Sequence, residues 1–390
     1  MSRIDLDSTT EPEISQDEDL LELRSTLRRL LARHTADLST PAGDFDRPLW
    51  ALLSQQVGVA GLAVPERLGG SGGGYLECHL VLEELGRTGA ATPFLASAVL
   101  ATQALLLSGT AAAADLLPDL AAGTRTATLM WGTGCELTAT GDGDSWVVDG
   151  RARPVLDGGR ADLLLAFAQP SAGSAALFLL DTAHSGLHRA LLPTMDQSLH
   201  LAEVNCRAVP ARLLSRPGDV RPTDARPTGP GEGADPASRL ADLAAIAITA
   251  EQVGGARRCL ELTVEYAKNR VQFGRPIGSF QAVKHRLADL LVLLESADSA
   301  SQAAAMAWVT AAEDASMLAS LAKSYCSEAY RAVTAETIQL HGGLGFTWEH
   351  PAHRYFKRAH STSALFGDPT YHRSRLAEQL GLLDPPGPAK

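Results

Sequence analysis

Two short segments in the C-terminal third carry residue types that suit a phosphate-containing ligand. The first is Arg270-Val271-Gln272-Phe273-Gly274-Arg275-Pro276-Ile277, and the second is Gln339-Leu340-His341-Gly342-Gly343-Leu344-Gly345-Phe346. An arginine offers a rigid fork of donors that matches phosphate oxygens. Glycines let the backbone approach a phosphate more closely than a side chain would permit. The alternative for either segment alone is structural: an exposed arginine in a loop that ends a helix, and glycines that terminate a helix.

Three further side chains could take part in proton transfer. The imidazole of His341 titrates near neutrality, but its place inside a glycine-rich turn favours packing against a bound ligand. Glu83 and Glu84 look like paired carboxylates. On a helix, however, adjacent residues point about 100° apart, which disfavours a joint catalytic role.

The cysteines lack metal-ligand spacing, and we expect no metal.

The composition limits the classes of protein to which this chain can belong. Its 390 residues suffice for two or three domains with a large buried core. The formal net charge of −11 argues against a nucleic-acid surface as the main function. The five scattered cysteines indicate reduced, buried thiols in a cytosolic protein. The acidic N-terminus does not resemble a signal peptide, and no uninterrupted apolar run reaches about 18 residues, so we expect no membrane span.

Helical periodicity dominates the first third of the chain. Residues 1–18 are polar and acidic, and we expect a flexible, disordered tail there. Residues 19–123 are expected to form a helical domain, with a loop at 64–74 that is rich in glycine. Its helices are expected at Leu20–Leu31, Trp50–Val57, Leu76–Arg87 and Ala96–Ser108.

The hydrophobic period changes over residues 124–217, where short β-like runs alternate with turns that contain Gly, Asp or Pro. This pattern predicts a small antiparallel β domain. Residues 218–238 predict an exposed linker loop, and the helical periodicity of residues 239–385 predicts a C-terminal four-helix bundle. The expected strands are Thr126–Trp131, Ser145–Val148, Leu163–Phe167, Ala176–Leu180 and Leu199–Val204, and the long bundle helices are expected at Arg239–Ala267, Phe280–Trp308 and Met317–Leu340.

With these motifs and this order of domains, the chain resembles the acyl-CoA dehydrogenase family from about Asp19 to Leu382. The two C-terminal motifs are the most specific part of the resemblance, because agreement at both by chance is improbable. Val64-Pro65-Glu66-x-Leu68-Gly69-Gly70 and Val81-Leu82-Glu83-Glu84-Leu85-Gly86-Arg87 add to it. The resemblance implies a mainly α protein with a central β domain: an N-terminal helical domain, a middle β-barrel and a C-terminal four-helix bundle.

The resemblance also implies FAD as cofactor, bound between two subunits. The two C-terminal motifs would reach into the neighbour's pocket and hold the ADP half. Arg270 would bind pyrophosphate oxygens, Phe273 would face adenine, and Gln272 could hydrogen-bond a base edge or the ribose. The FAD-binding residues expected on this basis are Arg270, Gln272, Phe273, Gly274, Gln339, His341, Gly342 and Gly343.

In the β domain the sequence departs from the family pattern. A Thr-Glu-Pro-x-Ala-Gly-Ser-Asp-like loop, which binds flavin and acyl-CoA in the family, is replaced by Trp131-Gly132-Thr133-Gly134-Cys135-Glu136-Leu137. On the strand that packs against the flavin ring, Pro154 takes the place of a tryptophan and Leu156 that of a hydroxyl residue. Leucine cannot donate a hydrogen bond, and proline removes a backbone donor. We therefore expect this chain to lose FAD binding in its own pocket.

The family's usual catalytic base is also missing. The family reaction removes an α-proton with a carboxylate, most often the Glu of a Tyr-Glu-Gly-Thr segment, while a β-hydride passes to flavin N5. Phe366 takes that position here and cannot accept a proton. Asp368 is a candidate base, although its place at the start of the next helix favours an N-cap. Some members carry the base on the first bundle helix, where Ala244 aligns; Asp242 lies close by on another face, and Glu251 is expected to be solvated or paired.

These features lead to three hypotheses. The first is a subunit of a heteromeric FAD-dependent acyl-CoA dehydrogenase, which contributes ADP-side contacts to a second acyl-CoA dehydrogenase-like subunit in an α2β2 assembly. The second is a homotetrameric enzyme that uses Asp368 as an atypical base. The third is a flavin-free relative that binds acyl-CoA or a partner as a scaffold. The resemblance further implies an electron-transfer flavoprotein as electron acceptor, and heteromeric relatives act on bulky CoA thioesters such as steroid side chains.

Overall fold

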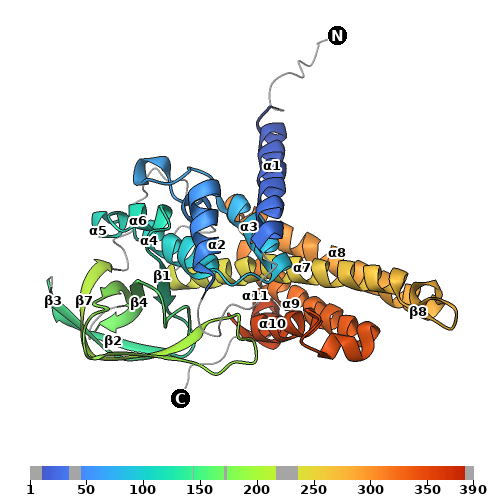
Figure 1. Ribbon diagram of the computed structural model, residues 1–390. Coiled ribbons are helices and arrows are strands. Elements are labelled where there is room, and N and C mark those ends of the chain that lie inside the picture. Colours follow the sequence, from blue (N-terminus) through green and yellow to red (C-terminus); the bar gives the residue numbers. More distant parts are fainter. Residues whose placement is uncertain (1–10, 35–44, 144, 171–173, 217–235, 383–390) are drawn as a thin grey trace, which may run out of the picture.

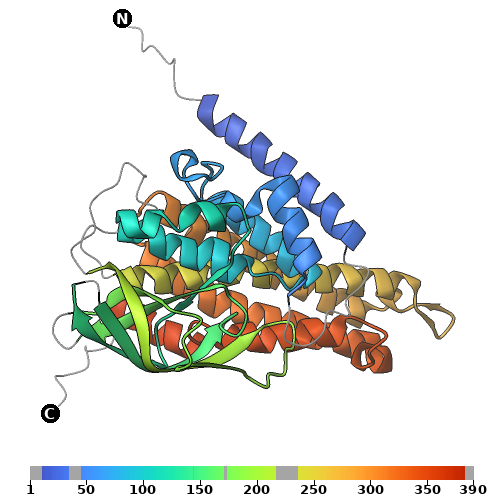
Figure 2. The ribbon, with the colours of Figure 1, turned by 60° about the vertical axis from the view of Figure 1, so that its left-hand side comes forward.

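The computed structural model describes residues 11–34, 45–143, 145–170, 174–216 and 236–382. In chain order it contains a helical N-terminal part, a β domain and a set of long C-terminal helices (Figures 1 and 2). This arrangement confirms the predicted fold class, mainly α with a central β domain. The β domain lies at one end of the long C-terminal helices in both views.

The N-terminal helices share an apolar core that also includes residues of the first C-terminal helix. The first helix begins at Glu11, so the predicted flexible tail over residues 1–18 extends too far. Proline is tolerated in the first turn of a helix, and acidic residues favour its N-terminal end; residues 1–10 lie outside the described part. The helices are α1 (Glu11–His34), α2 (Arg47–Leu52) with its π-helical extension Leu53–Val57, α3 (Tyr75–Thr88), the π-helical segment Phe94–Ala101 with α4 (Thr102–Ser108), α5 (Ala111–Ala114) and α6 (Leu117–Ala121).

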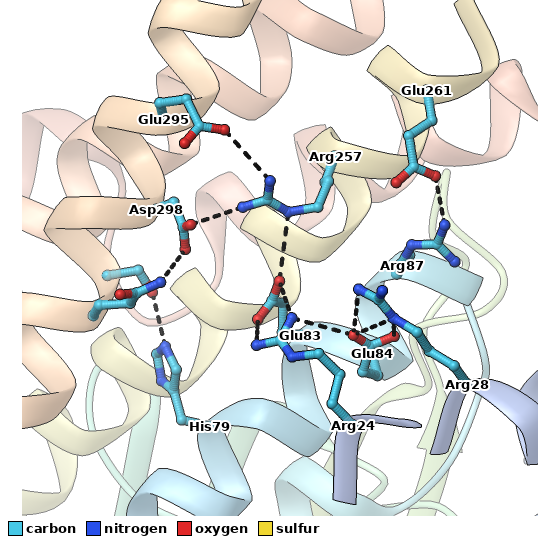
Figure 3. Close-up of polar contacts among 12 residues, drawn as sticks. Arg24, Arg28, His79, Glu83, Glu84, Arg87, Arg257, Glu261, Glu295 and Asp298 are labelled. Carbon is cyan, nitrogen blue, oxygen red and sulfur yellow. Dashed lines mark hydrogen bonds and ion pairs between the residues drawn. The ribbon is translucent and has the colours of Figure 1, made fainter. Parts of the chain in front are cut away.

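Two buried carboxylates of α3 connect α1 with α7 (Pro236–Asn269). Glu83 and Glu84 are only 6% and 1% exposed. Arg24 of α1 lies 2.9 Å from Glu83 and 3.3 Å from Glu84, and Arg28 lies 3.0 Å from Glu84 (Figure 3). Arg257 of α7 approaches Glu83 at 3.5 Å from the other side. The two glutamates therefore bind arginines that hold helices together, in agreement with the structural role that their spacing predicts.

The β domain closes into a ring of five strands. In this ring β4 pairs with β2, β2 with β3, β3 with β7, β7 with β5, and β5 with β4. Both β1 and β2 pair with β4 in parallel, so the prediction of a purely antiparallel domain is wrong. The β2–β3 hairpin separates β1 from β4 and provides the long connection that a parallel pair requires. The strands are β1 (Ala127–Met130), β2 (Cys135–Asp142), β3 (Ser145–Leu156), β4 (Leu163–Pro170), β5 (Ala176–Leu180), β6 (Leu187–Leu191) and β7 (Leu201–Ser215).

Sequence patterns missed β2 and β6 and made β3 too short. Strand β2 buries only small or isolated apolar residues and exposes Glu136, Thr138 and Thr140. Strand β6 lies beside β7 alone and is mostly exposed, so it carries little apolar signal. The part of β3 after Val148, which was not predicted, contains Pro154, and the β3–β7 register shifts there between Ala152 and Val155. Such a shift is expected where proline removes a ladder donor.

The C-terminal part packs α7, α8, α9 and α10 against one another, with α11 on α9. This packing agrees with the predicted bundle. The predicted linker over residues 218–238 lies mostly outside the described residues, but α7 already begins at Pro236, a residue favoured in the first helical turn. The remaining bounds are α8 (Gln281–Val309), α9 (Ala315–His341), α10 (Ala352–Ala364), α11 (Pro369–Gln379) and the short strands β8 (Val271–Gln272) and β9 (Arg275–Pro276).

Within the described ranges, no helix combines the length and apolar character that crossing a bilayer would require. The same residues contain no cluster of His, Cys, Asp or Glu that could hold a metal ion. All five cysteines are free thiols.

Candidate functional site

The Arg270 motif forms an exposed hairpin at the end of α7. Strands β8 and β9 pair through Gln272 and Arg275, and the backbone N–H of Ile277 donates to Arg270 O at 2.8 Å. Phe273 stands at the tip with φ 53° and is 91% exposed. The hairpin lies at the end of the long helices farthest from the β domain (Figure 1). Its polar and aromatic side chains therefore face outward from this chain.

The second motif ends α9 and continues into a 3-10 turn, Gly342–Phe346. Gly342 has φ 59° and ψ −139°, a conformation that is essentially restricted to glycine. A Cβ atom at Gly342 or Gly343 would meet no other atom within 4 Å. Gln339 is exposed on the last turn of the helix, and Phe346 is 81% exposed. The turn thus offers open backbone to an approaching ligand.

His341 connects the second motif with α7, one helical turn before Arg270. Its ring stacks on Tyr266 of α7, with centroids 4.4 Å apart, and lies 4.2 Å from the ring of His350. Nδ1 lies 2.7 Å from Thr337 O, and since a carbonyl only accepts, Nδ1 carries the proton. Nε2 is buried without a hydrogen-bond partner among the described residues. Burial lowers the pKa of His341, so a neutral ring that supports the turn is the role its surroundings favour.

The β-domain strand that would face a flavin ring offers no polar side chain at its two altered positions. Pro154 is exposed, and Leu156 is buried in the core shared with the N-terminal helices. The carbonyl of Leu156 already accepts a hydrogen bond from the Thr128 hydroxyl. The structure therefore shows no replacement at these positions for the missing hydrogen-bond donors.

At the position of the family's usual base, the ring of Phe366 stacks on Trp131 at the end of β1. The ring centroids are 6.0 Å apart and the planes differ by 21°. Phe366 follows α10 and has φ 60°, a left-handed conformation that is uncommon for a bulky residue. An aromatic pair thus connects the turn after α10 with the β domain.

Each carboxylate considered as a base has a structural partner. Asp368 caps α11, and its Oδ1 accepts from Tyr371 N at 2.8 Å. Asp242, 4% exposed, pairs with Arg375 at 2.5 Å. Glu251, 6% exposed, pairs with Arg358 of α10, in agreement with the expectation that it would be solvated or paired. Ala244 is fully buried.

Asp368→Asn is expected to change turnover of the assembled enzyme by less than about twofold, because asparagine caps a helix as well as aspartate does. The thermal midpoint should also stay close to that of the parent protein. A general base would behave differently, since its removal typically costs about 10²–10⁴-fold in rate. Steady-state kinetics and thermal unfolding of the two proteins distinguish these outcomes, and a loss of that size with intact folding would identify Asp368 as the base.

One buried charged side chain of this region went unnoticed in the sequence. Lys323 of α9 is 0% exposed and lies under the turn that follows α10. The sequence pattern could have revealed it, because Lys323 lies at helical spacing from Ala319, Cys326 and Tyr330 on the buried face of α9. A lysine on an apolar helix face is the pattern that marks a buried ammonium with specific partners.

Comparisons with known proteins agree with this architecture. The models "Acyl-CoA dehydrogenase, N-terminal domain" and "Acyl-CoA dehydrogenase, C-terminal domain" match residues 17–124 and 231–381. "Acyl-CoA dehydrogenase IpdE2" of Mycolicibacterium smegmatis is 37% identical over 363 residues, which cover 92% of this chain and 97% of the relative.

Two solved structures with similar folds have titles that name a steroid enzyme or a complex of two chains. A variant of the Tcur3481-Tcur3483 steroid ACAD has a TM-score of 0.82 at 31% identity and covers 94% of this chain and 98% of its own. The ChsE4-ChsE5 complex from Mycobacterium tuberculosis has a TM-score of 0.81 at 29% identity and covers 98% of this chain and 100% of its own. On the family models and these relatives, this chain belongs to the acyl-CoA dehydrogenase family of FAD-dependent oxidoreductases that act on acyl-CoA.

Proposed function

We propose that this chain is one subunit of a heteromeric acyl-CoA dehydrogenase and that it holds the ADP half of an FAD bound mainly by its partner. The partner, a second acyl-CoA dehydrogenase-like chain, would supply the flavin-ring contacts and the catalytic base. The reaction would be α,β-dehydrogenation of an acyl-CoA thioester. When bound, FAD supplies the hydride acceptor for that reaction.

The stacking of Phe366 on Trp131 is the observation that carries the proposal. A phenylalanine at the position of the usual base cannot remove a proton, and its ring takes part in an aromatic pair with the β domain. The nearest acidic residue along the chain, Asp368, is used as a helix cap. Proton abstraction within this chain's own half of the assembly therefore lacks a suitable residue at that position.

The residues at the far end of the bundle fit the ADP half of FAD. The guanidinium of Arg270 is exposed and can bind pyrophosphate oxygens. The ring of Phe273 is 91% exposed and offers an apolar face to adenine. Gly342 and Gly343 leave their backbone open to a phosphate. Because these groups face outward, a neighbouring subunit is the natural place for the ligand that they bind.

The β-domain side does not fit the flavin ring in the same way. Leu156 is packed in the core, its carbonyl is already used by Thr128, and Pro154 has no N–H to donate. A ring nitrogen or oxygen of the flavin would lose hydrogen bonds with water without gaining replacements from these positions. Within this one chain, the residues for the ADP half of FAD therefore suit their ligand, whereas those for the flavin ring do not.

The similar structures support a partner subunit and a bulky substrate. The titles of two of them name pairs of chains, and one calls its protein a steroid ACAD. On this basis we propose a CoA thioester with a large, ring-bearing acyl group as substrate. An electron-transfer flavoprotein is the electron acceptor that family membership favours.

The proposal is tested by purifying this chain alone and together with co-expressed acyl-CoA dehydrogenase-like chains of its own organism. We expect a colourless protein alone, and a yellow, active assembly with the correct partner, checked by absorbance, size and turnover. About one FAD per chain in the protein alone would instead support a homotetramer, as in symmetric enzymes. Absence of flavin under both conditions would support a flavin-free relative.

A further inference from the structure

Two buried side chains bind the backbone of the turn at 365–368, between α10 and α11. The first is Lys323 of α9, whose Nζ lies 3.0 Å from Ser363 O and 2.9 Å from Gly367 O. Its third neighbour is Ser327 Oγ, at 3.0 Å. An ammonium carries three N–H donors, so these three acceptors satisfy it completely. Lys323 thus connects α9 with the carbonyls on both sides of Phe366.

The second side chain is His372 of α11, which is 1% exposed. Its Nε2 lies 2.9 Å from Phe366 O, and because a carbonyl only accepts, Nε2 carries the proton. Its Nδ1 then presents a lone pair to Ser320 Oγ at 3.4 Å. Burial lowers the pKa of His372 to about 4, which agrees with this neutral form. Two carbonyls of the turn, those of Phe366 and Gly367, and one at the end of α10, that of Ser363, therefore accept hydrogen bonds from two buried side chains.

The backbone of this turn needs such support. Phe366 has φ 60° and Gly367 has φ 96°, and a bulky residue adopts the left-handed region only where its surroundings impose it. The Phe366 carbonyl is fixed by His372, and the carbonyls of Ser363 and Gly367 are fixed by Lys323. This conformation directs the Phe366 ring toward the β domain, where it meets Trp131.

A purely structural role does not explain Lys323, because burying its ammonium costs more free energy than burying an apolar side chain. Burial lowers its pKa to about 7, against opposing influences of Cys326 and Asp368, and its three hydrogen-bond partners are all neutral groups. An apolar residue would fill the same space without the cost of removing a charge from water. An apolar residue cannot bind the last turn of α10 and the Gly367 carbonyl of the turn at once, as Lys323 does.

We propose that Lys323 and His372 are positioning residues that hold Phe366 against Trp131, so that the aromatic pair closes this chain's own dehydrogenation cleft. The inference rests on the proposed function, because closing the cleft is useful only in a chain whose own half is not used for catalysis. It also goes beyond the proposed function, because it names what keeps the cleft closed. The backbone of the turn, fixed by Lys323 and His372, holds the Phe366 ring against Trp131, and the Phe366 side chain alone is not enough to do so.

The test is the accessibility of Trp131 in the full chain, purified without partner. Each protein is titrated with acrylamide, a fluorescence quencher, with and without the additional replacement Trp131→Phe. The difference between the two fluorescence signals is the fluorescence of Trp131. His372→Phe removes the donor to Phe366 O, whereas His372→Gln retains an N–H donor at the same place. We expect His372→Phe to raise the open population of the turn about tenfold, as for the loss of one hydrogen bond, and Lys323→Met, which removes two bonds to carbonyls, to raise it further. Both variants should increase quenching of Trp131.

His372→Gln should quench like the parent protein, and so should the control Val333→Ala, which alters a buried residue of the same helix on which Lys323 lies. If Lys323→Met does not fold, the two His372 variants still decide the matter. Unchanged quenching in His372→Phe, or equal increases in His372→Phe and Val333→Ala, would overturn the positioning role. Because the readout involves no flavin, the positioning role can fail while the FAD-sharing proposal stands, and the reverse.

Discussion

Replacing Arg270 by alanine is expected to weaken FAD binding of the assembled enzyme by about 10- to 150-fold, which corresponds to about 1.5–3 kcal/mol for a lost hydrogen bond to a charged group. The fold should not change, since the side chain is exposed and the hairpin is closed by backbone bonds to Tyr266 and Ile277. Titration of the flavin-depleted assembly with FAD gives the dissociation constant.

Arg29→Ala provides the matched control for this experiment. Arg29 is also exposed, but it lies on α1, and among the described residues its side chain bonds only to Thr26 of its own helix. Its replacement should leave the FAD dissociation constant unchanged. Equal retention of flavin by Arg270→Ala and the parent assembly would show that Arg270 does not bind the cofactor, and the ADP-side role of this chain would then fail.

Arg358→Met is expected to lower the free energy of unfolding by about 3–5 kcal/mol, the range for breaking a buried ion pair by removal of one partner. The side chain of Arg358 in α10 is 12% exposed and lies between Glu251 of α7, at 2.5 Å, and Asp196 of the β domain, at 3.4 Å. These carboxylates raise the pKa of Arg358. Methionine fills much of the volume but removes the ion-pair partner of two buried carboxylates, and it removes a contact between the β domain and the bundle.

Arg373→Met is the matched control, because Arg373 forms an ion pair with Glu328 in which both side chains are about half exposed. Its replacement should cost about 0–1 kcal/mol, as is usual for surface pairs. Denaturant unfolding followed by circular dichroism measures both variants. Similar losses in the two variants would mean that the buried position of Arg358 adds nothing to the stability of the domain contact.

The elements with regular apolar periodicity were predictable from the sequence. The helix expected at Phe280–Trp308 is observed as α8, Gln281–Val309, and the strand expected at Ala176–Leu180 is observed as β5 with the same bounds. Both patterns depend on neighbours within a few residues. The parallel pairing of β1 with β4 and the closure of the strands into a ring depend on contacts between distant segments, and no local pattern encodes them.

In the candidate site, too, the features that depend on local sequence were predictable and those that depend on distant contacts were not. The capping role of Asp368 follows from a local rule, since a capping residue precedes a proline at the first helical position. The stacking of Phe366 on Trp131 and the hydrogen bonds of Lys323 to the turn before α11 join segments that are far apart in the chain. Residue types alone indicated that a base was missing there, but only the tertiary structure shows what occupies the position.

The central claim, that this chain shares a partner's FAD without binding its own, is tested most directly by the number of FAD molecules per pair of different chains. Flavin released from the purified heteromer is quantified by absorbance against the amount of each chain. The account predicts about one FAD per pair, with the two pockets of the pair unequal. A value of about two FAD per pair would show that this chain's β domain binds flavin after all and would contradict the account.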